Sequence, residues 1–131
     1  LESYPDRCNS QLISKWKSTV ENQYHPYVVP QENGAHQDTK WFSLINHQGD
    51  QLKFNIVEAS SFSASSMHDK DLSKSVIISQ LKPRPTTEVH VDVAIRGLGT
   101  GACGPDTLEE FRLTSGTYEM GWSIEVLSAI H

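Results

Sequence analysis

Two segments in which apolar and polar residues alternate place the tightest constraint on how this chain folds. In EVHVDVAIR, residues 88–96, Val or Ile stands at every second position from 89 to 95. TYEMGWSIEVL, residues 117–127, alternates in the same way. A period of two is typical of a strand that buries one face and exposes the other. Both segments are therefore predicted to be half-buried strands.

Shorter runs with β-forming residues extend this pattern along the chain. They are YHPYVV (24–29), TKWFSLI (39–45), QLKFNIV (51–57) and EEFRLTS (109–115), separated by the turn signals NG, QGD, KPRP and SGT. Strands at such spacing favour an antiparallel sandwich. Residues 69–81, DKDLSKSVIISQL, are the one helical candidate, and KPRPTT after them is too rich in proline to continue an element. We predict an all-β antiparallel β-sandwich with at most one short helix, as a single domain over residues 1–131.

Charge and hydropathy exclude two classes of partner. The formal net charge is −5, and the eleven Lys and Arg residues are scattered without a run. Nucleic acid and anionic lipid are therefore not expected as partners. No stretch approaches the roughly 20 apolar residues that would insert into a membrane. The chain begins at Leu1 without an initiator Met, which we interpret as a processed or excised end.

The glycine-rich and histidine-containing segments do not match the sequence patterns that bind nucleotides or metal ions. The glycine-rich stretch GLGTGACGP, residues 97–105, lacks the Lys-Ser/Thr of a nucleotide-binding loop, so we interpret it as a turn or a ligand rim. The six histidines never fall at metal-ligand spacing, and no metal or cofactor is predicted. Cys8 and Cys103 could form a disulfide that stabilises the fold by about 4–5 kcal/mol, or remain two thiols.

Carbohydrate binding requires fewer precisely placed chemical groups than catalysis does. An aromatic ring takes the apolar face of a sugar, and a few polar groups bond its hydroxyls. One predicted turn and one predicted strand face carry such polar groups. The candidate sugar-binding residues are Glu32, Asn33, His36, Trp41, His90, Asp92, Arg96 and Thr100. For each polar residue a solvated surface position is the alternative, and for Trp41 and Trp122 the alternating pattern favours a place in the core.

The order of several separated motifs resembles one family. The motifs are ESYPDR, VENQYHPYVVPQENG, DTKW, FSASS, DLSKS, VHVD, GLGTGACGP and EEFRLTSGTYEM. From Glu2 to about Val126 the chain is similar to the C-terminal, small-chain (fifth) domain of family 2 β-galactosidases. The resemblance implies the C-terminal part of a β-supersandwich and a context of galactosides. It also implies that the two catalytic glutamates belong to a preceding barrel, so that this chain alone is not expected to hydrolyse a glycoside.

The same resemblance places residues 97–105 at the mouth of the enzyme's active site. Many family members have a tryptophan there that stacks on the leaving-group sugar, and Cys103 stands at that position here. His36 and Lys40 stand where the family usually has arginine. The stacking role therefore cannot be carried over to this chain.

Two functions remain open at this point. The first is a non-catalytic galactose-binding lectin, secreted and forming homo-oligomers, with its site between residues 32–36 and 96–100 and with Trp41 or Tyr27 as the aromatic platform under the sugar. The second is an excised C-terminal piece of a β-galactosidase that packs on the barrel and completes its aglycone side. The first is the main expectation, because the barrel is missing and the site residues are altered.

Overall fold

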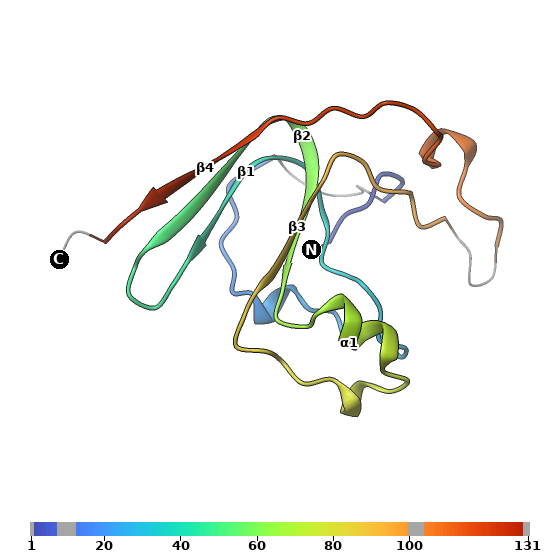
Figure 1. Ribbon diagram of the computed structural model, residues 1–131. Helices are drawn as coiled ribbons and strands as arrows, with labels where there is room; N and C mark the ends of the chain where they lie inside the picture. Colours follow the sequence, from blue (N-terminus) through green and yellow to red (C-terminus); the bar gives the residue numbers. More distant parts are fainter. Residues whose placement is uncertain (1, 8–12, 100–103, 130–131) are drawn as a thin grey trace.

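The computed structural model describes residues 2–7, 13–99 and 104–129 (Figure 1). The chain forms a curled sheet with one short helix at one end. In order, its elements are η1 (Glu21–Gln23), β1 (His36–Ile45), β2 (Gln51–Ser65), α1 (Asp69–Lys74), η2 (Ile78–Gln80), β3 (Glu88–Asp92), η3 (Glu109–Phe111) and β4 (Trp122–Leu127). None of the described helices is long and apolar enough to cross a membrane.

The sheet has four strands, and β2 lies at its centre. Strand β1 pairs antiparallel with one edge of β2. On the other edge, β4 pairs with the first half of β2 and β3 with the second half. Figure 1 shows the β1–β2 hairpin and β4 reaching away from α1, which follows the far end of β2. All pairings are antiparallel, so the predicted all-β antiparallel class is confirmed, with this sheet as the layer that the described residues contribute.

Two register shifts between β1 and β2 account for the curl of the sheet. From His36 to Thr39, β1 advances three residues while β2 advances two, and from Thr39 to Trp41, β1 advances two residues while β2 advances five. Asp38, beside the first shift, has a φ of 56°. An extra residue in one strand bends that strand and increases the local twist. The two halves of β2 therefore face different surroundings, and only the second half lies beside α1.

Three phenylalanines from β1 and β2 form the centre of the core. The Phe42 ring stacks on Phe54 at 4.4 Å and on Phe62 at 4.2 Å between centroids, and only 6% of Phe42 is exposed. The short helix closes one side, since its only buried residue is Leu72. The expectation of at most one short helix is confirmed, because the predicted helical segment becomes α1 followed by the single turn η2.

Two predicted strands are not strands in the structure. Residues 24–29 run irregularly, because Pro26 and Pro30 cannot donate to a ladder. Residues 109–115 begin with the 3-10 turn η3, in which the Phe111 N–H donates to the Leu108 carbonyl. The expected burial of Trp122 is also wrong for this chain, because 55% of this residue is exposed.

Candidate functional site

The turn at residues 30–34 is built from hydrogen bonds between backbone and side chains. The Asn33 side-chain oxygen accepts the His25 N–H at 3.0 Å, and its amide nitrogen donates to the carbonyls of His25 and Gln31 at 3.3 and 3.0 Å. Gly34, with a φ of 77°, donates its N–H to Glu2 Oε2 at 2.9 Å. The polar atoms of the Asn33 side chain, which were predicted to bind a sugar, therefore stabilise this turn.

Next to this turn, five ionisable residues come together on the β2–β3 end of the sheet. This carboxylate–histidine cluster consists of Glu32, Asp69, Glu88, His90 and Asp92. His90 Nε2 lies 3.5 Å from Asp69 Oδ2 and 4.0 Å from Glu88 Oε2. The Asp69 N–H at the start of α1 donates to Glu88 Oε2 at 2.9 Å, which ties the helix to β3.

Register explains why these residues converge. Glu88, His90 and Asp92 lie opposite Ser65, Ser63 and Ser61 of β2, so all six side chains belong to one face of the sheet. Ser61 and Ser63 are buried, at 2% and 5% exposure. The alternation visible in EVHVD thus placed His90 and Asp92 together, and it could also have identified Glu88. No local sequence pattern indicated that Asp69, the first residue of α1, would join this cluster.

The cluster concentrates negative charge in a partly buried place. Burial raises the pKa of Glu32, the charge of Asp69 raises it further, His90 opposes the rise and Asp92 adds to it. Burial also raises the pKa of Asp92, where His90 opposes the shift and Asp69 reinforces it. Asp69, Glu88 and His90 each offer one ligand atom, and these atoms lie within 4.8 Å of one another.

The other predicted sugar-binding residues do not join this cluster. His36 Nε2 contacts Gln23 Oε1 at 2.6 Å, and its ring stacks on Phe62 at 5.2 Å between centroids. Trp41 is 45% exposed, and Lys15 Nζ lies 5.9 Å from its ring centroid. Tyr27 donates its hydroxyl to Glu2 Oε1.

Strand geometry separates Trp41 from the histidine. Trp41 lies opposite Asn55, whereas His90 lies opposite Ser63, eight residues further along β2. At roughly 3.3 Å per residue the two positions are up to about 26 Å apart along the strand. Trp41 is therefore not a platform for a sugar held by His90, which corrects the predicted grouping.

Arg96 belongs to a second region, around the glycine-rich loop. Its guanidinium pairs with Asp106, which Arg112 also approaches at 3.5 Å. Leu98 and Gly99 donate their N–H groups to the Asp6 carboxylate at 3.0 and 2.7 Å. The N-terminal YPDR segment thus holds the start of this loop, a role that no sequence pattern indicated.

The far side of the same loop is also anchored. The Thr107 hydroxyl donates to the Gly97 carbonyl at 2.8 Å, and Thr107 is only 1% exposed. The Arg7 guanidinium donates to the Gly99 carbonyl. Thr100, Cys8 and Cys103 lie outside the described residues, so the predicted sugar contact of Thr100 and the predicted disulfide remain predictions.

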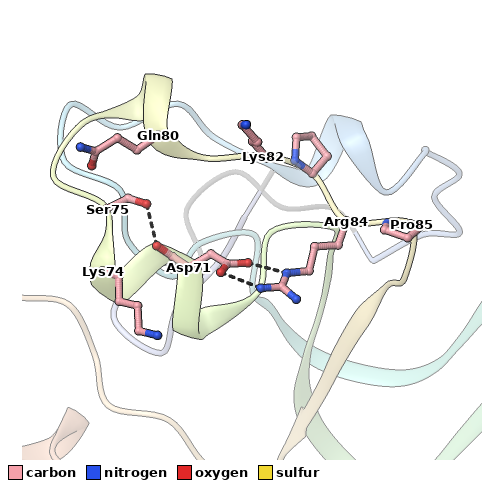
Figure 2. Close-up of a pocket in the computed structure, with 8 residues that line it drawn as sticks. Asp71, Lys74, Ser75, Gln80, Lys82, Arg84 and Pro85 are labelled. Atoms are coloured by element: carbon pink, nitrogen blue, oxygen red, sulfur yellow. Dashed lines mark hydrogen bonds and ion pairs between the residues drawn. The ribbon is translucent and has the colours of Figure 1, made fainter.

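A recess of about 450 Å³ lies between the end of α1 and residues 80–85 (Figure 2). Figure 2 shows Arg84 forming two hydrogen bonds with Asp71, at 2.6 and 2.8 Å, while the Ser75 hydroxyl donates to the Asp71 carbonyl at 2.7 Å. These bonds fix the chain that returns from α1 to β3. Three of the residues that line the recess, Asp71, Ser75 and Arg84, thus bond to one another.

Acid is expected to release the glycine-rich loop from Asp6. Burial alone would raise the pKa of Asp6, but the N–H groups of Gly99 and Leu98 outweigh it and hold this pKa below its ordinary value. A depressed carboxyl pKa contributes stability above the ordinary value, and that stability is lost as the pH falls through the folded-state pKa. An NMR titration of the Gly99 amide from neutral pH downwards should therefore show its main shift below the ordinary range of aspartate.

The variant Asp6→Asn serves as the control for this titration. It should remove the acid-dependent shift of the Gly99 amide while the β2 amides keep their positions. A Gly99 shift that is centred at or above the ordinary aspartate range, or that persists in Asp6→Asn, would contradict the assignment.

Comparison with known proteins shows which family this chain resembles. The family model described as beta galactosidase small chain matches residues 1–124. A β-galactosidase of Staphylococcus xylosus is 27% identical over 128 residues, which is 95% of this chain and 12% of that protein. A β-galactosidase of Streptococcus thermophilus is 28% identical over 130 residues, covering 97% of this chain and 13% of that protein.

A yeast protein gives the same result. The β-galactosidase of Kluyveromyces lactis is 31% identical over 113 residues, which is 86% of this chain and 11% of that protein. The chain therefore spans about an eighth of the length of the relatives that it matches. With an antiparallel sheet, an ordered set of family motifs and a match along residues 1–124, the chain belongs to the beta-galactosidase small-chain family.

Proposed function

We propose that this chain acts as the non-catalytic C-terminal part of a family 2 β-galactosidase, which packs against the rest of the enzyme and supports the aglycone side of its active site. The relatives are named β-galactosidases, and each extends far beyond the part that this chain matches. The observation that carries the proposal is an apolar part of one sheet face, along β4, that the described residues leave exposed.

This β4 face is made by β4 and the first half of β2. Register puts Trp122, Ile124 and Val126 opposite Ile56, Phe54 and Leu52, so all six side chains lie on one face. Ile56 and Phe54 on this face join the core, whereas the three β4 side chains and Leu52 are exposed. Every residue of β4 is exposed, and Val126 is exposed to 73%. Large exposed apolar patches are typical of surfaces that contact another part of a protein. An enzyme domain packed on this face would bury it.

The lectin hypothesis has less support. Asn33 directs its polar atoms to backbone groups, and Arg96 pairs with Asp106. Trp41 lies opposite Asn55, eight residues along β2 from the partner of His90. Two of the polar residues expected to hold a sugar, Asn33 and Arg96, are thus engaged in bonds within the chain. Galactose binding by the chain alone is not part of the proposed function.

Calorimetric titration with galactose and lactose, with a chromogenic galactoside assayed on the same sample, tests this proposal. We expect neither saturable binding nor turnover by the chain alone, and turnover once it is joined to a family 2 catalytic barrel. Saturable galactose binding by the chain alone would instead support the lectin. Turnover by the chain alone would contradict both hypotheses.

A charge on the β4 face should disrupt the packing. In the polypeptide that carries this chain behind a catalytic barrel, Ile124→Lys is expected to lower galactoside hydrolysis by about tenfold or more, because a lysine in an apolar interface costs several kcal/mol. The matched control is Ser123→Lys, which places the same charge on the opposite face of the same strand. Equal activity of the two variants would show that the β4 face is not an interface.

A further inference from the structure

We propose that Asp69, Glu88 and His90 bind one divalent transition-metal ion at the junction of α1 and β3. This inference stands on the carboxylate–histidine cluster and does not depend on the proposed function. The three residues come from two elements that meet at one end of the sheet, where β2 ends, α1 begins and β3 starts (Figure 1).

The separations of the donor atoms fit a shared ion after a small adjustment. Zinc binds nitrogen and carboxylate oxygen at about 2.0–2.2 Å, so two of its ligand atoms lie at most about 4.4 Å apart. His90 Nε2 is already 3.5 Å from Asp69 Oδ2 and 4.0 Å from Glu88 Oε2, and all three donors lie within 4.8 Å. The Asp69 side chain is 49% exposed, which leaves it room to rotate towards the other two.

His90 adds a second observation. Its Nε2 atom is shielded from solvent, although 31% of the side chain is exposed, and within the described part of the chain this atom makes no hydrogen bond besides its ion-pair approaches to Asp69 and Glu88. Buried polar atoms normally have a partner, and one that lacks it destabilises the fold. This atom points between two carboxylates, and a metal ion held there would satisfy it.

The charges around these donors also favour a cation. Glu32 and Asp92 approach the same place, and their pKa values are raised by burial and by Asp69. Arg84, whose pKa the hydrogen bond to Asp71 raises first and the charge of Glu88 raises further, is held by Asp71 through two hydrogen bonds. Four carboxylates thus face one histidine, and a divalent ion would offset part of that negative charge.

The donor set indicates which ions fit. One imidazole nitrogen and two carboxylate oxygens suit zinc or manganese, whereas magnesium and calcium prefer oxygen ligands alone. Three protein ligands on a partly exposed site leave a coordination position for water. The proposed site is therefore a weak or moderate site for an ion of the zinc and manganese type.

Titration of the full chain with Mn²⁺, followed by the electron paramagnetic resonance signal of the free ion, tests the proposal. Manganese is the better probe because, unlike zinc, it does not favour thiolate ligands, so that the signal does not depend on the state of Cys8 and Cys103. One saturable site is expected. Its affinity should fall by about tenfold or more in His90→Ala and in the isosteric Glu88→Gln, since losing a direct ligand costs at least as much as losing a supporting group.

The matched control is His47→Ala, which removes an exposed histidine from the β1–β2 turn and should bind Mn²⁺ like the unmodified chain. Far-UV circular dichroism identifies any variant that has lost the fold, and Glu88→Gln keeps the test valid if His90→Ala has done so. Absence of saturable binding by the unmodified chain up to millimolar Mn²⁺ would overturn the proposal. Binding that is unchanged in both donor variants would do the same.

Discussion

Replacing Phe42 with alanine is expected to lower the free energy of unfolding by about 3–5 kcal/mol, the usual cost of truncating a buried phenylalanine. Phe42 is the middle ring of the stack with Phe54 and Phe62, and it is 6% exposed. Its removal would leave a cavity between the two halves of β2. Because whole domains are stable by only about 5–15 kcal/mol, this loss would be a large part of the total.

Urea denaturation followed by tryptophan fluorescence measures this effect. Phe42→Leu keeps most of the volume and should lose much less, so it gives a value even if Phe42→Ala does not fold. Val76→Ala, at a residue that is 72% exposed, should stay within about 0.5 kcal/mol of the unmodified chain. Similar midpoints for Phe42→Ala and Val76→Ala would show that the phenylalanine stack is not the centre of the core.

The strands with clear alternation were predictable, and the serine-rich half of β2 was not. QLKFNIV predicted a strand that ends near Val57, whereas β2 continues to Ser65. The additional residues place Phe62 and Ala64 on one face of the strand and three serines on the other. Serine and alanine have low β-propensity, so this segment does not look like a strand in the sequence. Pairing with β3 supplies the backbone hydrogen bonds that make this half a strand, and such a long-range pairing is not visible in local sequence.

The candidate site was predictable to a similar degree. His90 and Asp92 share a strand face by period alone, and the structure brings Glu32 beside them. The cluster is completed by Asp69, whose position depends on how α1 packs after β2. Trp41 was grouped with these residues by chemistry, and only the register reveals that it belongs to the other half of the sheet.

A methyl group at Gly99 is expected to destabilise the glycine-rich loop by about 2–4 kcal/mol. Gly99 has a φ of 69°, which costs an L-residue roughly 1–2 kcal/mol. An added Cβ would also lie 2.7 Å from the backbone nitrogen of Thr107, and a backbone atom cannot move aside as a flexible side chain can. Gly99→Ala should therefore break the bonds by which Asp6 and Thr107 hold this loop.

The chain offers a closely matched control in Gly116→Ala. A Cβ at Gly116 would meet no atom within 4 Å, and its φ is not in the left-handed region, so this variant should be neutral or slightly stabilising. Hydrogen exchange of the Leu98 amide should speed up in Gly99→Ala and stay unchanged in Gly116→Ala. If the loop supports the aglycone side of an enzyme, Gly99→Ala in the whole polypeptide should raise KM for galactosides with a bulky leaving group. Unchanged exchange and unchanged stability in Gly99→Ala would mean that the loop does not need the conformation that only glycine adopts easily.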